Sequence, residues 1–257
     1  MRDRIRTGLA HNARVWNHWL DGKDNYAVDQ EVGRQVAGMF PGIAEVARAD
    51  RAFLGRSVSY LAGEAGIRQF LDIGTGLPTA DNTHEVAQRI APDARIVYVD
   101  NDPIVLTHAR ALLSGTPAGA TEYVDADAHD PDSILRSASE TLDLSRPVAV
   151  MMLGILNFVL DTDRARSIVR TLMDALPSGS HLVLTHPTLE LGGEGNADAM
   201  AFWNENATPP ITARSRAEFT SFLDGLEIVE PGIVSCARWG APEAAEVAQF
   251  GAVGRKP

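Results

Sequence analysis

A glycine loop preceded by an acid carries the clearest chemical signal in the sequence. Asp72, Gly74, Thr75 and Gly76 follow a short apolar run, which predicts a buried strand that ends in a sharp turn before a helix. Glycines in such a turn let the backbone approach a ligand closely. A pyrophosphate-binding loop would carry a third glycine, but this chain has Thr79 near that place. The carboxylate of Asp72 suits instead the cationic amino-acid end of S-adenosylmethionine.

Acids also stand at the ends of the next two expected strands. Asp100 has the spacing from the glycine loop at which an acid accepts hydrogen bonds from ribose hydroxyls, and Asn101 follows it. Asp127 is expected to accept from an adenine amino group, while the backbone N–H of Ala128 donates to a ring nitrogen. Each acid alone has an alternative as a helix cap or a solvated loop residue. Acids at three successive strand ends together favour a nucleoside ligand.

The segment after the fourth expected strand and two histidines are the candidates for the chemical step. Gly154 is expected beside the transferable methyl group and Asn157 beside the acceptor, because ligands of open α/β sheets lie outside the carboxyl ends of the strands. Methyl transfer from a sulfonium is an in-line displacement, so the protein mainly positions the reactants. Where the acceptor must lose a proton, His186 is the first candidate base and His18 the second. A surface or capping role is the alternative for each histidine, and no residue pattern indicates a metal site.

Alternating strand and helix patterns position these residues. From residue 68 onward, short apolar runs alternate with helical patterns, which is typical of βαβ units and a parallel sheet. The expected strands are residues 69–73, 95–100, 121–125, 147–153, 181–185, 226–230 and 249–254. The last two have no crossover helix between them, so we expect an antiparallel hairpin at the sheet edge. The sequence therefore predicts an α/β, Rossmann-like fold with a seven-stranded, mostly parallel sheet.

Two segments outside this pattern are expected to border the site. Residues 1–65 have no strand pattern, and helices near residues 14–20, 29–39 and 43–61 predict a helical cap over a domain formed by residues 66–257. Residues 188–210, rich in glycine and proline, predict an irregular stretch after the fifth strand. This stretch is either a lid or substrate loop, or a packed surface insertion.

The composition indicates a globular chain with an acidic surface. The chain has 257 residues, 45% of them hydrophobic, which suffices for a large core. Its formal net charge of −11 disfavours nucleic acid as a partner and favours neutral or cationic small molecules. With a single cysteine, Cys236, and no signal-peptide or transmembrane pattern, we expect a cytoplasmic protein without a membrane partner. The oligomeric state is not indicated.

Three segments also carry a family resemblance. They are Trp-Leu-Asp-Gly-Lys-Asp-Asn-Tyr at 19–26, Ala-Asp-Arg-Ala-Phe-Leu at 49–54 and the glycine loop at 70–79. Together they resemble the bacterial S-adenosyl methyltransferase family, whose members were long grouped as proteins of unknown function. The resemblance implies the class I methyltransferase fold and S-adenosyl-L-methionine as cofactor, with S-adenosyl-L-homocysteine as product. The family pattern suggests a histidine or similar residue where this chain has Asn157, so a base role there is doubtful.

The resemblance also adds candidate cofactor contacts near the N-terminus. Lys23, Asp24, Asn25 and Tyr26 are expected either to contact the site or to form a solvated loop. Arg51 is expected to pair with the cofactor carboxylate, or with an acid on the surface.

The expected activity is methylation of a small molecule on oxygen or nitrogen, and two alternatives stay open. An NAD-dependent oxidoreductase shares the fold, but its glycine loop carries a third glycine and lacks the acid at 72. A non-catalytic S-adenosylmethionine-binding module would share the cofactor residues without turnover.

Overall fold

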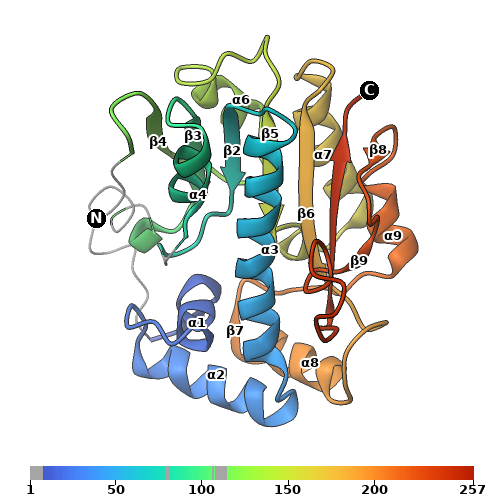
Figure 1. Ribbon diagram of the computed structural model, residues 1–257. Helices are drawn as coiled ribbons and strands as arrows, with labels where there is room; N and C mark the ends of the chain where they lie inside the picture. The colour runs from blue at the N-terminus through green and yellow to red at the C-terminus, as the bar shows by residue number, and fades with distance from the viewer. Residues whose placement is uncertain (1–7, 79–80, 106, 108–114) are drawn as a thin grey trace.

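A computed structural model describes residues 8–78, 81–105, 107 and 115–257, and within them a mixed β-sheet forms the centre of the molecule (Figure 1). The order of its main path is β4-β3-β2-β5-β6-β10-β8, and β9 pairs with β10 beside this path. The strands are β2 (Gln69–Ile73), β3 (Arg95–Asp100), β4 (Ala120–Asp125), β5 (Ala149–Leu153), β6 (His181–Pro187), β8 (Glu227–Ile228), β9 (Val234–Ser235) and β10 (Gln249–Arg255). Strands β4 to β6 along this order are parallel, which confirms the α/β, Rossmann-like fold.

The antiparallel part of the sheet differs in detail from the prediction. β10 is antiparallel to both β6 and β8, so the predicted antiparallel pairing of the last two strands is confirmed. These two strands also end the main path of the sheet, as predicted, with β8 outermost. The connection from β8 to β10 carries the short strand β9, which the sequence did not predict. The predicted count of seven strands missed β9, because a strand of two residues leaves no periodic pattern in the sequence.

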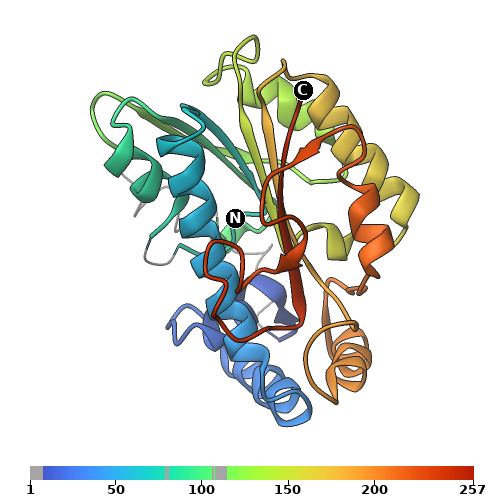
Figure 2. The same ribbon diagram turned by 45° about the vertical axis from the view of Figure 1, so that its right-hand side comes forward.

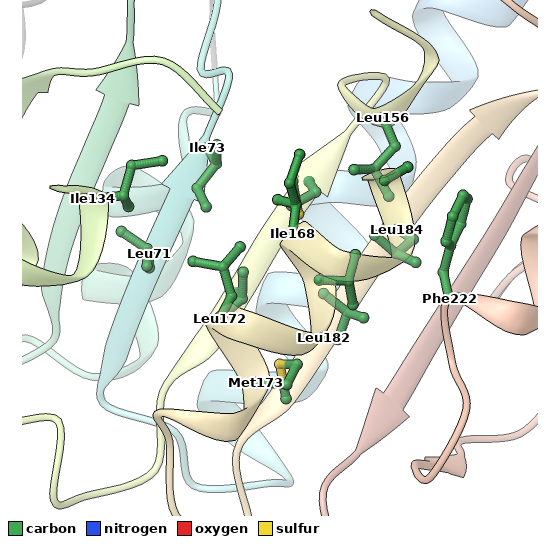
Figure 3. Close-up of a cluster of buried hydrophobic side chains, with 14 of the residues drawn as sticks. Leu71, Ile73, Ile134, Leu156, Ile168, Leu172, Met173, Leu182, Leu184 and Phe222 are labelled. Carbon is green, nitrogen blue, oxygen red and sulfur yellow. The ribbon is translucent and has the colours of Figure 1, made fainter. Parts of the chain in front are cut away.

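Helices cover both faces of the sheet. The helices α3 (Ile43–Gly63) and α4 (Thr83–Ile90) lie on one face, and α6 (Pro131–Ala138), α7 (Thr162–Asp174) and α9 (Arg216–Ser221) lie on the other. Neighbouring strand residues point to opposite faces, so Phe70 packs under α3 whereas Leu71 faces Leu172 of α7 (Figure 3). Burial on both faces explains the continuous apolar runs of the central strands.

A third layer lies beyond one end of the sheet (Figures 1 and 2). It consists of α1 (Asn12–Trp19), α2 (Ala27–Met39), the first half of α3, α8 (Asn196–Asn206) and the strand pair β1 (Ala10–His11) and β7 (Ala207–Thr208). Its apolar cluster joins Trp19 of α1 and Val36 of α2 to Trp203 of α8. Three N-terminal helices therefore form where the sequence predicted them. The prediction that residues 188–210 are irregular is wrong, because α8 occupies half of that stretch and packs on α2. Among the described residues, none of the helices has the length and hydropathy of a membrane span.

Candidate functional site

The glycine loop leaves β2 at the end of the sheet that faces the third layer. The N–H of Gly74 donates to the carbonyl of Val99 at 2.8 Å, and the N–H of Gly76 donates to Asp100 Oδ2 at 2.9 Å. Both glycines have positive φ, +77° and +66°, which glycine adopts without a Cβ penalty. A Cβ on Gly74 would lie 1.8 Å from Ile155 Cδ1, whereas a Cβ on Gly76 would meet no atom within 4 Å. Gly74 is thus required for packing, and Gly76 leaves open space for a ligand.

One cavity, which we call the polar cleft, extends from this loop over the ends of β3 and β4. It is lined by Asp100, Asn101, Asp127, Ala128 and His129 together with residues of the loop and of α1. The carboxylate of Asp127 accepts from the N–H and the ring of His129 and from Asn101 Nδ2 at 3.2 Å. Burial raises the pKa of Asp127, but these hydrogen bonds bring it below its ordinary value. The four residues that the sequence predicted for a nucleoside therefore come together in one cleft.

Asp100 joins the glycine loop to the polar cleft. Its two oxygens accept from the backbone N–H groups of Gly76 and Asp102, both at 2.9 Å, which fixes the carboxylate at the mouth of the cleft. Burial nevertheless raises the pKa of Asp100 above its ordinary value. A fixed carboxylate with remaining lone pairs is suited to accept hydrogen bonds from neighbouring hydroxyl groups.

A second cavity, which we call the aromatic chamber, lies between the loop and the third layer. Its walls include Trp16, Trp19, Phe40 and Trp203, and the predicted residues Arg51, Asp72, Gly74, Thr75, Gly76, Gly154 and Asn157 also line it. The chamber and the polar cleft share Asn12, Ala13, Gly74, Gly76 and Ile155. A single elongated ligand can therefore extend from the cleft into the chamber past the glycine loop.

Asp72 lies at the edge of the aromatic chamber nearest the loop. Thr83 Oγ1 donates to its Oδ2 at 2.6 Å, and the residue is only 5% exposed. Burial raises the pKa of Asp72 to about 6, although the hydrogen bond from Thr83 and the charge of Arg51 act in the opposite direction. A carboxylate and a guanidinium at one end of the chamber can bind the ammonium and carboxylate of an amino acid.

Asn157 follows β5 in a short 3₁₀ turn, Leu156–Phe158, and lines the aromatic chamber. Its side chain is 6% exposed, and its Oδ1 has no hydrogen-bond partner among the described residues. A buried carbonyl oxygen without a partner costs free energy, on the order of 1–3 kcal/mol, that a ligand donor would recover. This supports a direct ligand contact for Asn157.

The expectation that His186 faces the pocket is wrong. His186 lies on β6 next to Thr185, which points towards α3, so the imidazole points to the opposite face and packs beside Phe222. Arg214 Nη1 donates to its Nε2 at 2.7 Å, which leaves Nδ1 to donate to the carbonyl of Pro187. Burial lowers the pKa of His186 to about 4, so the ring is neutral and fully engaged. His186 is a structural residue in this arrangement.

Two other groups of predicted residues do not line either cavity. His18 packs against Gly33 of α2. The loop with Lys23, Asp24, Asn25 and Tyr26 lies at the surface, and the N–H of Asp24 and Nδ2 of Asn25 both donate to Asn17 Oδ1 of α1. Asn17 itself lines the aromatic chamber. The loop thus positions a chamber residue instead of reaching the chamber with its own side chains.

Sequence reasoning missed Asp50, which lines the chamber from α3. Thr185 Oγ1 and Gln249 Nε2 both donate to its Oδ1, the former at 2.6 Å, and burial raises its pKa to about 6. A signal was present, because Asp50 is a lone acid among the apolar positions Ala47, Leu54 and their neighbours on one face of α3.

The residues present fit S-adenosylmethionine. The polar cleft offers carboxylates and backbone groups for an adenosine, the space above Gly76 is open, and Asp72 with Arg51 offers opposite charges for an amino acid. Asp72, Asp100 and Asp127 stand at the ends of the neighbouring strands β2, β3 and β4 in the same order as the amino-acid end, the ribose and the adenine of such a ligand. The fit explains why a third glycine for a pyrophosphate is not needed.

Comparisons with known proteins agree with this geometry. A family model described as S-adenosyl methyltransferase matches residues 1–257. A DUF574 family protein from Streptomyces avermitilis is 45% identical, with 98% of this chain and 99% of that chain covered and a TM-score of 0.93. A protein from Thermobifida fusca is 39% identical, with 96% and 95% covered and a TM-score of 0.87.

A more distant structure shows the same fold. The N-methyltransferase NodS from Bradyrhizobium japonicum, solved with S-adenosyl-L-homocysteine, is 15% identical, with 89% of this chain and 97% of that chain covered and a TM-score of 0.51. No curated protein matches the chain. The family match decides against the oxidoreductase alternative. The chain belongs to the S-adenosyl methyltransferase family, and it is a methyltransferase that depends on S-adenosylmethionine.

Proposed function

We propose that this methyltransferase methylates a small organic molecule held in the aromatic chamber. The observation that carries the proposal is the junction of the two cavities at Gly74, Gly76 and Ile155. A cofactor whose adenosine lies in the polar cleft brings its other end into the chamber at this junction. The rest of the chamber is then available for an acceptor.

We assign the cofactor contacts residue by residue. Asp127 and the N–H of Ala128 hold the adenine, Asp100 accepts from the ribose hydroxyls, and Asp72 with Arg51 holds the amino-acid end. When bound, S-adenosylmethionine supplies a methyl group on a positively charged sulfur, which needs no further activation. The chain's own task is therefore to hold an acceptor in line with that group.

The shape and charge of the site favour a small acceptor. Side chains of α1, α2 and α8 line the chamber, so among the described residues the third layer limits the size of an acceptor that can enter it. The net charge of −11 disfavours a nucleic acid. Gly154 and Asn157, which follow the strand next to β2, are the residues that we expect beside the acceptor atom, oxygen or nitrogen.

Binding measurements test the cofactor assignment. We expect calorimetry to show saturable binding of S-adenosyl-L-homocysteine and no binding of NAD⁺. We expect an affinity at least tenfold lower in Asp100→Asn, since each hydrogen bond to a charged group is worth about 1.5–3 kcal/mol. Asp174→Asn, an exposed acid at the end of α7, is the matched control and keeps wild-type affinity. Tight binding of NAD⁺ without a response to S-adenosyl-L-homocysteine would contradict the assignment.

A labelling experiment tests the acceptor class. The enzyme is incubated with methyl-labelled S-adenosylmethionine and a cell extract, which is then separated into metabolites, protein and nucleic acid. We expect the label in the metabolite fraction. Label that appears only on protein or nucleic acid would overturn the proposal of a small acceptor.

A further inference from the structure

Asp50 is a buried carboxylate that the cofactor assignment does not use. It is 5% exposed, and it forms no ion pair among the described residues. Both of its hydrogen bonds, from Thr185 Oγ1 and Gln249 Nε2, end on Oδ1. The carboxylate is therefore held in one orientation, and Oδ2 keeps its lone pairs for a ligand in the aromatic chamber. A buried carboxylate that forms no ion pair costs free energy, and an ammonium ligand would offset part of that cost.

Asp50 lies where α3 passes β6 and β10. Its partners stand at the ends of β6 and β10, whereas Asp72 is on β2. Two strand spacings separate β6 from β2 in the sheet, about 10 Å at roughly 4.8 Å per spacing. The strand partners of Asp50 are therefore two strands away from Asp72 along the sheet, although the charge of Asp50 is close enough to raise the pKa of Asp72.

Asn157 presents a second oxygen between these two positions. It follows β5, the strand that separates β2 from β6, and its buried Oδ1 lacks a partner among the described residues. The inner wall of the chamber thus offers acceptor oxygens from Asp50 and Asn157. A ligand satisfies both only if it carries hydrogen-bond donors.

The remaining walls add an apolar, aromatic surface. Trp19 Nε1 donates to the carbonyl of Gly33 and Trp203 Nε1 donates to the carbonyl of Pro209, so these indoles turn their apolar rings to the chamber. Among the described residues that line the chamber, Arg51 is the one cation, and it follows Asp50 directly on α3, where we assign it to the cofactor carboxylate. Aromatic faces and a buried carboxylate that forms no ion pair together attract an amine or ammonium group.

We propose that the acceptor is an amine carried on a flat, apolar framework, and that Asp50 Oδ2 and Asn157 Oδ1 bind its N–H groups. This inference rests on the proposed function, and it adds the class of acceptor and the residue that removes its proton. The apolar framework lies against Trp19 and Trp203.

Asp50 supplies the proton acceptor that the proposed methylation needs. The bound ammonium gives one proton to Asp50 Oδ2, and the resulting neutral pair is favoured by the apolar walls. The freed nitrogen lone pair forms the new bond to the methyl carbon. The electrons of the carbon–sulfur bond stay on sulfur, and the product leaves as a methylated ammonium ion. Asp50 is then a catalytic residue, because it contacts the reacting nitrogen.

The test is a binding measurement with probes of matched shape. The protein is saturated with S-adenosyl-L-homocysteine at pH 8 and titrated with tryptamine, tryptophol and indole-3-acetate, and with the phenyl analogues phenethylamine, 2-phenylethanol and phenylacetate. We expect the amine of at least one series to bind at least tenfold more tightly than its alcohol and its carboxylate. In Asp50→Asn the amide presents a donor where the carboxylate presented an acceptor, so we expect the amine preference to fall at least tenfold while affinity for S-adenosyl-L-homocysteine changes less than threefold.

The outcomes separate this inference from the proposed function. Failure of the wild type to bind S-adenosyl-L-homocysteine would defeat the proposed function itself. If S-adenosyl-L-homocysteine binds normally but the alcohol or the carboxylate binds as tightly as the amine or more tightly, the amine inference alone is overturned. The same holds if no probe binds. An Asp50→Asn variant that loses S-adenosyl-L-homocysteine affinity and keeps the amine preference assigns Asp50 to the cofactor and also overturns it. Asn157→Ala, which removes the second oxygen, repeats the test in case Asp50→Asn does not fold, and we expect it to reduce amine affinity at least threefold.

Discussion

Substitution of Gly74 by alanine tests the structural basis of the junction between the two cavities. The new Cβ would lie 1.8 Å from Ile155 Cδ1 and 2.1 Å from Ile155 Cγ1, and the residue would keep a φ of +77°. Alanine in the left-handed region costs roughly 1–2 kcal/mol, and overpacking of a buried site costs roughly 1–3 kcal/mol. Gly74→Ala should therefore lower the free energy of unfolding by about 2–5 kcal/mol.

Gly76→Ala is the matched control. It has a similar φ of +66°, but its Cβ would meet no atom within 4 Å. We expect only the backbone cost, about 1–2 kcal/mol. Its Cβ would occupy the open space assigned to the cofactor, so this variant should lose affinity for S-adenosyl-L-homocysteine while its stability falls less than that of Gly74→Ala. Urea unfolding followed by circular dichroism measures the stabilities, with an unchanged m-value as the sign of the same unfolding reaction.

A double-mutant cycle with Ile155→Ala isolates the clash. Ile155→Ala removes the two atoms that the new Cβ would meet, so the two substitutions should be coupled by about 1–3 kcal/mol. The contact of Gly74 with Ile155 would not explain the need for glycine if the changes in free energy of unfolding of the two single variants simply add in the double variant. The same would follow if Gly74→Ala and Gly76→Ala lost equal stability.

Three further predictions concern charge and packing around the site. Burial raises the pKa of Asp72 to about 6, so the protonated side chain contributes stability below pH 4 and this contribution is lost as pH rises through 6, whereas binding of the cofactor's ammonium needs the ionised side chain. Calorimetry from pH 5 to 7.5 should therefore show the affinity for S-adenosyl-L-homocysteine rising at least tenfold. This rise should vanish in Asp72→Asn but persist in the control Asp174→Asn. Burial lowers the pKa of His186 to about 4, so the neutral ring stabilises the fold above pH 6.5, and the free energy of unfolding falls by roughly 3 kcal/mol between pH 6.5 and 4. Urea unfolding of His186→Gln should show a smaller fall in stability over this range. An equal fall in both proteins would count against the buried neutral ring. A Cβ on Gly22 would lie 2.2 Å from Asn17 Nδ2, so Gly22→Ala should lower the free energy of unfolding by about 1–3 kcal/mol and weaken ligand binding in the chamber. Gly38→Ala, on the exposed face of α2 with no atom within 4 Å of its new Cβ, should be neutral or stabilising, and equal behaviour of the two variants would argue against the contact.

The parts of the site that the sequence predicted are local in the chain. The glycine loop and the acids at 72, 100 and 127 each follow a strand with a clear apolar pattern, and parallel strands bring their carboxyl ends to one edge. The arrangement of Asp100, Asn101, Asp127 and Ala128 around one cleft follows from strand order alone. Local pattern and the rules of parallel sheets therefore suffice to bring these residues together, but they do not place the predicted loop residues 23–26, which line neither cavity.

The acceptor half depends on contacts that no local pattern reveals. Asp50 is fixed by Thr185 and Gln249, which are 135 and 199 residues away in the chain. The error at His186 arose because β6 runs to Pro187, two residues beyond the predicted end at 185, so His186 follows the alternation of the strand and points to the face opposite Thr185. The error at residues 188–210 arose because α8 is stabilised by packing of Trp203 on the N-terminal helices rather than by its own apolar stripe.

The central claim is that one cofactor extends from the polar cleft past the glycine loop into the aromatic chamber. A crystal structure of the complex with S-adenosyl-L-homocysteine tests it most directly. We predict the adenine beside Asp127 and Ala128, the ribose hydroxyls on Asp100, and the sulfur open to the chamber between Asp72 and Asn157. An adenine bound in the aromatic chamber, or a sulfur turned away from it, would contradict the account.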